Sequence, residues 1–309
     1  MQGAAESAAP AAWRHAWVYL KLVAVALLWG GTFIAGRLLA QDVPPLLAAS
    51  LRFAVAVPLL LLAAWKIEGG LPRLSPAQLL ATAGLGFFGI FVYNICFFAA
   101  LAQMPAGRTA LFVALNPIVT TLLLAVFFRE RIGALCWVAI AIAFTGAAII
   151  ITRGDLMGAW RDLSQSLGAA ELYMLCGITG WAIYTILGRY ALRGLTPIAA
   201  TTYAVLWGAA MLGAGALLEQ GTLAPAGIGW RAWGAIAYLG VFGTVIGFIW
   251  YYEGVKAIGP SRAAVFNNLV PVSGVLLAAL VLGEPVLLSM VVGAVLVISG
   301  VTMANLRRG

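Results

Sequence analysis

The sequence predicts an all-α polytopic membrane protein, with ten transmembrane helices arranged as two inverted five-helix repeats around a central cavity. Three observations predict this fold class: an apolar composition, apolar runs of membrane-spanning length, and an internal repeat. Of the 309 residues, 63% are hydrophobic and 9% are charged, and the mean hydropathy is +1.03. Soluble domains carry about 25% charged residues, so this chain has too few charges to cover a soluble surface.

The apolar runs are about 20 residues long, which is the length that crosses a hydrocarbon core of ~30 Å as a helix. Continuous runs also exclude a transmembrane β-barrel, whose strands are short segments of alternating hydrophobicity. Short connections separate ten such runs. We expect the spans near residues 19–39, 46–65, 77–101, 109–128, 132–152, 169–192, 197–218, 232–253, 263–282 and 286–306.

The two halves of the chain repeat each other. Phe97–Glu130 matches Tyr251–Glu284 at a constant offset, and the starts of the two halves match in the same way. The matched pairs include Trp29 with Trp181, Arg108 with Arg262, Phe112 with Phe266, Pro117 with Pro271, and Glu130 with Glu284. Because each unit holds five spans, an odd number, the second unit enters the membrane upside down. Inverted repeats of this kind place a pathway near the midplane between the halves, which predicts alternating access.

The repeat also divides the chain. We expect a flexible cytoplasmic N-terminus at 1–16, a first five-helix repeat at 17–152, a linker at 153–168 and a second, inverted repeat at 169–306. The linker is the longest polar connection, which makes it the natural boundary between the two halves.

The net charge of +8 does not indicate nucleic-acid binding. The 18 basic residues stand singly or in pairs between apolar runs, without a basic stripe. Most of them fall on one side of the membrane when the N-terminus is placed inside. The positive-inside rule therefore predicts that both termini are cytoplasmic.

No enzyme chemistry, metal or cofactor is expected. The three cysteines, Cys96, Cys136 and Cys176, lie far apart in sequence, each within an apolar run. Their spacing suits neither a metal site nor an obvious disulfide, so we interpret them as small buried hydrophobic residues. The sequence lacks the phosphate-binding loop motif of ATPases, and a single histidine leaves little material for a catalytic centre.

The phrase L-L-W-G-G-T-F-I-A-G-R at 27–37, followed by L-R-F-A at 51–54, resembles the drug/metabolite transporter superfamily. The likeness is to the ten-helix branch with two EamA-type repeats, and it covers most of the chain. Within that branch, the sequence looks most like the YddG-type exporters of aromatic and other amino acids. The resemblance implies export of small organic metabolites through a central cavity in a bacterial inner membrane. One departure is Arg129 before Glu130, where the second repeat has Gly283.

Polar side chains within the spans are the first candidates for substrate binding, because each needs a partner or a watery cavity. Asn94, Asn267 and Asn268 lie within predicted spans. They could face the cavity and bond the amino or carboxyl group of a substrate. The alternative is that they hold neighbouring helices together, as Asn commonly does in membranes.

Aromatic residues deep within the spans are a second group of candidates. Trp29 and Trp181 occupy matching positions in the two repeats, and Tyr93, Tyr184 and Tyr251 lie at similar depth. The O–H and N–H groups of buried Tyr and Trp need partners, which a shared cavity would supply. Packing or lipid-facing roles are the alternative.

Arg52 is the charge that the sequence places clearly inside a span. It could attract a carboxylate of the substrate. It could equally extend its guanidinium toward the membrane surface or bond the carbonyls of a neighbouring helix.

Four residues are candidates for gating. Pro117 and Pro271 occupy matching positions in two spans, where a proline kinks a helix and frees a carbonyl. They are either hinges or static kinks. Glu253 and Lys256 stand three positions apart and are predicted to pair on one helix face, either as a simple salt bridge or as part of a gate.

The sequence therefore predicts a monomeric secondary transporter in the lipid bilayer, which exports aromatic or other neutral amino acids and similar metabolites. A multidrug carrier, a lipid carrier or a scramblase of the same fold is the alternative, and a channel would need a filter that the sequence lacks. Without an aspartate inside a span, facilitated diffusion competes with proton antiport as the energy source.

Overall fold

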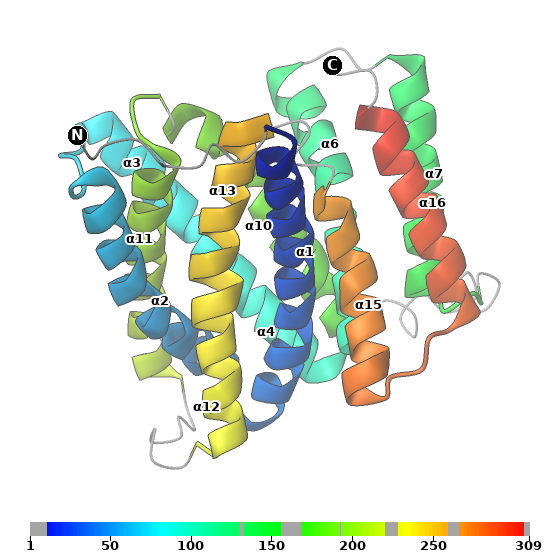
Figure 1. Cartoon of the computed structure of the whole chain (residues 1–309). Helices are drawn as coiled ribbons and strands as arrows, with labels where there is room; N and C mark the ends of the chain where they lie inside the picture. The colour runs from blue at the N-terminus through cyan, green and yellow to red at the C-terminus, as the bar shows by residue number, and fades with distance from the viewer. Residues whose placement is uncertain are drawn as a thin grey trace.

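The structure is a computed structural model, and it describes residues 11–129, 133–155, 168–191, 193–219, 228–258 and 266–305. The regular secondary structure of these residues is helical (Figure 1). The helices of the first half are α1 (Ala11–Asp42), α2 (Pro45–Glu68), α3 (Pro76–Leu85), the π-helix η1 (Gly86–Val92), α4 (Tyr93–Gln103), α5 (Ala106–Val113), α6 (Asn116–Phe128) and α7 (Ala134–Ile151). Those of the second half are α10 (Ala169–Ala191), α11 (Pro197–Leu218), α12 (Trp230–Ala237), the π-helix η3 (Tyr238–Ile246), α13 (Gly247–Ile258), the 3₁₀ turn η4 (Phe266–Asn268), α15 (Leu269–Leu282) and α16 (Leu288–Asn305).

Within the described residues, eight helical segments are long and apolar enough to cross a membrane. Several combine consecutive helices: α3, η1 and α4 form one segment, α5 and α6 another, and α12, η3 and the start of α13 a third. The last two predicted spans appear as shorter apolar helices, Phe266–Leu282 and Leu288–Met303. The protein is thus a multi-pass helical membrane protein, and the part of the chain that the structure describes holds eight candidate spans where the sequence predicts ten.

Local sequence explains where several helices begin and end. Oγ of Ser75 accepts a hydrogen bond from the backbone N–H of Gln78, and the backbone N–H of Ser75 donates to Oε1 of Gln78, which forms a capping box at the start of α3. Gly283 ends α15 with a left-handed φ of 67°. Arg129 takes the equivalent role after α6 with a φ of 54°, although this conformation disfavours a residue with a Cβ.

The two π-helices stand at matching positions of the two repeats. Gly86 packs on α11, and Gly240 packs on α2. A methyl group at Gly86 would lie 2.7 Å from the carbonyl oxygen of Ala204, and one at Gly240 would lie 2.9 Å from that of Arg52. Ala204 and Arg52 are themselves matched by the repeat. A π-helix inside an α-helix leaves local carbonyls free and often marks a functional site.

The two prolines predicted to act as hinges or static kinks lie in first turns, directly after irregular turns within their apolar segments. After a break at Ala114 and Leu115, α6 begins, and Pro117 occupies its first turn. Pro271 lies in the first turn of α15, directly after η4. Proline is well tolerated there because the amide hydrogens of a first turn have no partner within the helix. The prolines therefore mark helix restarts.

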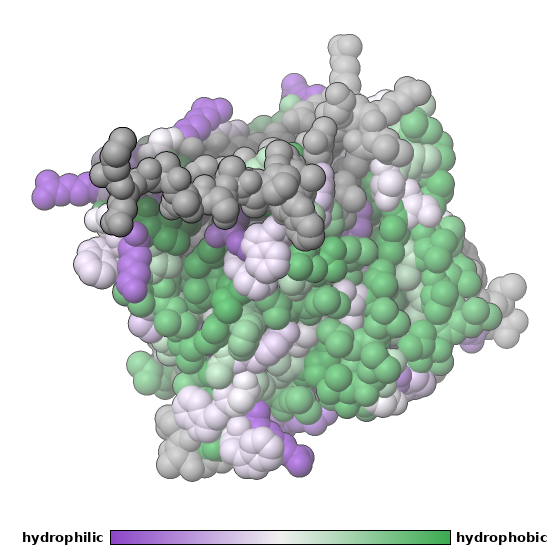
Figure 2. Space-filling model, in the orientation of Figure 1, coloured by the Kyte–Doolittle hydropathy of each residue, from purple (hydrophilic) through white to green (hydrophobic). Residues whose placement is uncertain are grey.

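Contacts near the helix termini show which termini lie at the same end of the molecule. At one end, Lys21 of α1 pairs with Glu253 of α13, and Glu68 accepts a hydrogen bond from Thr196 at the start of α11. At the other end, Glu219 accepts hydrogen bonds from the Leu46 and Leu47 amides at the start of α2. The start of α1 and the end of α16 lie at the same end, the upper one in Figure 1. Figure 2 shows a broad apolar band on the visible face, with hydrophilic residues toward both ends.

Helices α7 and α16 pack antiparallel through small residues. A methyl group at Gly146 would lie 2.6 Å from the Gly293 carbonyl oxygen, and one at Gly300 would lie 2.6 Å from that of Ala139. These two contacts exchange under the sequence repeat, because Gly146 matches Gly300 and Ala139 matches Gly293. Small residues let helix backbones approach closely in membranes, where van der Waals packing drives association.

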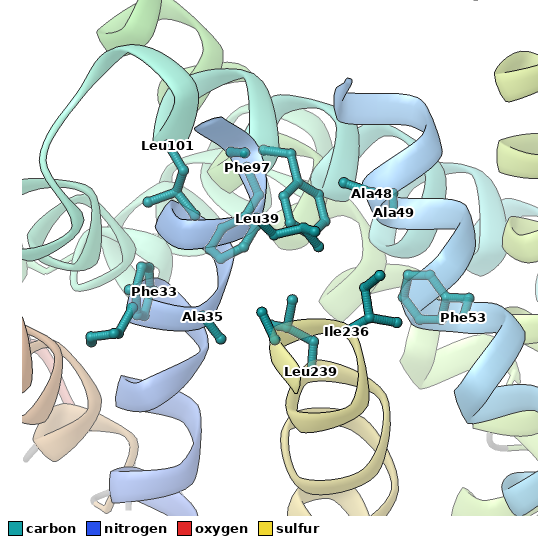
Figure 3. Close-up of a cluster of buried hydrophobic side chains, with 14 of the residues drawn as sticks. Phe33, Ala35, Leu39, Ala48, Ala49, Phe53, Phe97, Leu101, Ile236 and Leu239 are labelled. Atoms are coloured by element: carbon teal, nitrogen blue, oxygen red, sulfur yellow. The ribbon is translucent and has the colours of Figure 1, made fainter. Parts of the chain in front are cut away.

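The main core lies between the two halves. Its labelled side chains converge from α1, α2, α4 and the α12–η3 segment (Figure 3). Phe33, Phe53 and Phe97 are its largest members here, and Ile236 and Leu239 fill the space between them. This packing holds α2, α4 and η3 together, and these three elements carry the polar cluster described next.

Candidate substrate-binding site

A buried polar cluster joins α2, α4 and η3. Arg52 donates from Nη1 to Oδ1 of Asn94 at 3.0 Å and from Nε to Oγ1 of Thr244 at 3.2 Å. Only 9% of Arg52 is exposed, 2% of Asn94 and none of Thr244. Thr244 also donates to the Leu239 carbonyl at 2.9 Å, five residues earlier, which the wider turns of the π-helix allow. The cluster therefore depends on the π-helix.

The partners of Arg52 in this cluster are neutral. The salt bridges of the described residues are Lys21–Glu253 and Arg108–Glu171, and neither involves Arg52. A guanidinium buried away from water is costly unless an anion compensates its charge. Nε and Nη1 of Arg52 make the two hydrogen bonds above. Among the described residues, no carboxylate forms an ion pair with the positive charge of this guanidinium. The site is electrostatically suited to an anion.

Trp29 of α1 closes one side of the cluster. Its Nε1 donates to the carbonyl of Gly243 at 3.0 Å, and its ring centroid lies 5.4 Å from that of Tyr251 and 5.7 Å from that of Phe248. Asn267 donates from Nδ2 to the Tyr251 hydroxyl at 3.4 Å. Trp29, Tyr251 and Asn267, all predicted from sequence, are thus one connected group.

A second aromatic group lies on α4 and α10. The ring of Trp181 lies 5.0 Å from Tyr93 and 5.0 Å from Tyr184. Gly89 of η1 makes room for this group, because a methyl group there would lie 2.2 Å from the Tyr184 ring. The matched tryptophan of each repeat thus contacts at least one aromatic residue of the other repeat.

The aromatic groups adjoin the polar cluster. Gly243 accepts the hydrogen bond of Trp29, and a methyl group at Gly243 would lie 3.9 Å from Nη2 of Arg52. On the other side, Tyr93 precedes Asn94 in α4 and lies within electrostatic reach of Arg52. Asn268 is half-buried at the end of η4, and the hydrogen bonds and ring contacts of the described residues do not join it to the cluster.

One predicted gating residue, Glu253, makes its ion pair with a residue outside this cluster. Glu253 pairs with Lys21, and their side chains are 50% and 22% exposed. The side chain of Lys256 lies outside the described residues, so the predicted Glu253–Lys256 pair stays a prediction. The linker at 153–168 is likewise described only at Arg153, Gly154, Asp155 and Gly168.

The sequence reasoning missed a second buried charge cluster. Arg108 donates from Nη1 to Oε1 of Glu171 at 2.9 Å and from Nη2 to the Ile151 carbonyl, and both charged side chains are less than one-tenth exposed. The sequence placed Arg108 just before its span, but the helix begins at Ala106, where Glu284 accepts hydrogen bonds from the Ala106 and Gly107 amides. The sequence signal that could have identified Arg108 was its match with Arg262 in the internal repeat. A pocket of about 220 Å³ borders Arg108 and Glu284.

The fold and the buried polar cluster define a multi-pass membrane protein with a polar site enclosed between its helices. Comparison with known proteins gives the class its name. The model of the EamA-like transporter family matches residues 16–152 and again residues 168–306. The chain belongs to this family, and it is a transporter of the drug/metabolite type with two EamA domains.

Relatives cover nearly the whole chain. Uncharacterized transporter YyaM of Bacillus subtilis is 30% identical over 292 residues, covering 94% of each chain. Uncharacterized inner membrane transporter YedA of Escherichia coli K12 is 31% identical over 273 residues, covering 85% of this chain and 82% of YedA. A protein solved by crystallography aligns with a TM-score of 0.64 at 20% identity, over 94% of this chain and 97% of that one. That last likeness shows the fold alone.

Proposed function

We propose that this transporter exports small metabolites that carry a carboxylate, neutral and aromatic amino acids above all, across a bacterial inner membrane by alternating access. The observation that carries the proposal is Arg52, a buried guanidinium whose partners Asn94 and Thr244 are both neutral. A carboxylate is the planar anion that matches a guanidinium, and hydrogen bonds between ionised groups are about twice as strong as neutral ones.

The surroundings of Arg52 favour a substrate with an apolar or aromatic part. The ring group of Trp29 adjoins it through Gly243, and the ring group of Trp181 adjoins it through Tyr93, the neighbour of Asn94. Aromatic side chains bury large apolar area and prefer stacked or edge-on partners, so they would hold the side chain of an amino acid. Asn94, at 3.0 Å from Arg52, has an amide that could meet the remaining polar group of the substrate.

The inverted arrangement of the repeats is part of this proposal. It is supported by the antiparallel contacts of α7 with α16, which exchange under the repeat, and by the matched π-helices. We take the ends of the chain to be cytoplasmic, with ten spans in all, and the monomer to be the working unit. In such a fold, the pathway lies at the interface of the repeats, where the Arg52 cluster is found.

The energy source in this proposal is the substrate gradient. Proton antiport commonly uses a buried acid, and Glu171 is the acid most deeply buried among the described residues. Its carboxylate is already engaged, by Arg108 at 2.9 Å and by the Gly168 amide at 2.9 Å. Facilitated diffusion therefore fits better than proton exchange.

The test is efflux from proteoliposomes preloaded with labelled amino acids, with and without an imposed pH gradient. We expect saturable efflux of neutral or aromatic amino acids that the gradient leaves unchanged. Arg52→Gln should lower it about tenfold or more, whereas Arg231→Gln, which removes an exposed charge at the start of α12, should retain it.

The other outcomes separate the alternatives. Absence of efflux for every amino acid, in protein shown to be folded, would contradict the proposal and favour a carrier of drugs or lipids. Efflux that never saturates would indicate a channel. Acceleration by the pH gradient would replace facilitated diffusion with proton antiport.

A further inference from the structure

The π-helix of each repeat packs on a helix of the other repeat through an equivalent glycine. Gly243 of η3 packs on α1, where a methyl group would lie 2.6 Å from Cγ2 of Thr32. Gly89 of η1 packs on α10, where a methyl group would lie 2.2 Å from the ring of Tyr184. Gly89 and Tyr184 occupy the positions that the sequence repeat matches with the first pair. The two contacts are therefore equivalent interfaces between the repeats.

The matched tryptophans at these two interfaces differ in their hydrogen bonds. At the first interface, Trp29 donates from Nε1 to the Gly243 carbonyl at 3.0 Å. The equivalent bond at the second interface would run from Nε1 of Trp181 to the Gly89 carbonyl. Among the residues that the structure describes, the half-buried Trp181 makes no hydrogen bond from Nε1, although its ring packs in the second aromatic group. One interface thus has the bond and its match lacks it.

We propose that this hydrogen bond is exchanged during transport: it joins Trp29 to Gly243 in the state described here, and Trp181 to Gly89 in the state open to the opposite side. The proposal rests on the alternating access proposed above. Two inverted repeats exchange their environments when access changes sides, so a bond made by one repeat in one state is made by its match in the other. The exchange keeps the two states close in free energy, because each state contains one such bond.

The residues beside the two tryptophans explain why the bond forms at one interface at a time. A methyl group at Gly247 would lie 2.5 Å from Nε1 of Trp29, so this glycine leaves room for the indole at the Gly243 carbonyl. The matching position in the first repeat is Tyr93, whose ring lies 5.0 Å from that of Trp181. In the exchange, the Tyr93 ring turns aside and Trp181 moves to the carbonyl.

The experiment measures distances between two spin labels in full-length protein in proteoliposomes, without substrate. The three native cysteines, of which Cys96 alone is fully buried, are first replaced by alanine. One pair of labels reports on α1 and α13, and the other reports on the matching helices α10 and α4. The labelled positions are exposed and matched by the repeat: Trp17→Cys with Ala257→Cys, and Ala169→Cys with Gln103→Cys. Double electron–electron resonance gives the ratio of the two states from each pair.

The test variants remove one indole N–H each and keep an aromatic ring. Trp29→Phe should shift the ratio about fivefold away from the state described here, which corresponds to the loss of one hydrogen bond. Trp181→Phe should shift the ratio toward this state by a similar factor. Combining the two substitutions should return the ratio to its wild-type value. Trp65→Phe, at an exposed tryptophan, is the matched control and should leave the ratio unchanged.

Three results would contradict parts of this account. If Trp181→Phe changes the ratio neither alone nor together with Trp29→Phe, the exchange is overturned, and the asymmetry is a fixed consequence of Tyr93. Shifts of the two single variants in the same direction would also overturn the exchange. Lack of amino-acid efflux in wild type would contradict the proposed function instead, while the label distances, which need no substrate, still test the exchange.

Discussion

Asn94 accepts a hydrogen bond from Arg52 at 3.0 Å, and it does so as a neutral amide at a position where an aspartate would have nearly the same shape. Changing Asn94 can therefore distinguish two roles of Arg52: binding the anion of a substrate, or only joining neighbouring helices. We predict that Asn94→Asp supplies the missing anion within the protein. It should lower the apparent affinity for carboxylate substrates about tenfold or more, or ~1.4 kcal/mol, without loss of thermal stability.

Asn94→Ala is the comparison. It removes one hydrogen bond, which costs about 1 kcal/mol of stability, but leaves the charge of Arg52 uncompensated. Saturation curves for efflux and thermal unfolding in detergent would be measured for both variants. Wild-type transport of carboxylates by Asn94→Asp would show that Arg52 does not receive the substrate.

Trp29 should contribute to the stability of the protein and to substrate binding through both its N–H group and its ring. Trp29→Phe loses the bond to the Gly243 carbonyl, worth about 1 kcal/mol. Trp29→Ala also loses the ring contacts with Tyr251 and Phe248, each worth about 0.5–1.5 kcal/mol. We expect Trp29→Phe to lower both stability and substrate affinity, and Trp29→Ala to lower both further. Trp65→Phe, at an exposed tryptophan, should match wild type, and an unimpaired Trp29→Ala would refute this role.

The buried pair Arg108–Glu171 should matter far more to stability than the exposed pair Lys21–Glu253. Glu171→Gln leaves the buried guanidinium without its anion, and its Nε already has no hydrogen-bond partner, so we expect a loss of about 3–5 kcal/mol. Glu253→Gln should cost at most about 1 kcal/mol. The measurement is unfolding by sodium dodecyl sulfate in mixed micelles. Equal losses of stability in Glu171→Gln and Glu253→Gln would contradict the claim that the buried pair matters more.

The orientation of the chain can be tested with single cysteines in a variant that lacks the native three. Arg73 and Asp155 are both exposed, at connections that we assign to opposite sides of the membrane. An impermeant maleimide should label Asp155→Cys in intact cells, and Arg73→Cys only after the cells are permeabilised. The reverse pattern would invert the proposed topology.

The sequence predicted the helices well because their signals are local. The run predicted at 46–65 is α2, Pro45–Glu68, and the run at 132–152 is α7, Ala134–Ile151. Length and hydrophobicity suffice for such segments. Arg108 was misplaced because a boundary error of two or three residues decides whether a charge lies in a loop or within a helix.

The candidate site was predicted residue by residue, but its connections were not. Arg52, Asn94 and Trp29 were named as candidates, whereas the second partner of Arg52, Thr244, lies 192 residues away along the chain. The π-helices were also missed, because they have the same apolar pattern as the helices around them.

The central claim, that Arg52 receives a carboxylate, is tested most directly by comparing the efflux of an amino acid with that of its amide. The two compounds have nearly the same shape, but only the acid carries the anion. Wild type should prefer the acid by about tenfold or more, Arg52→Lys should keep part of this preference, and Arg52→Gln should lose it. An acid-to-amide ratio that is the same in wild type and Arg52→Gln would contradict the account.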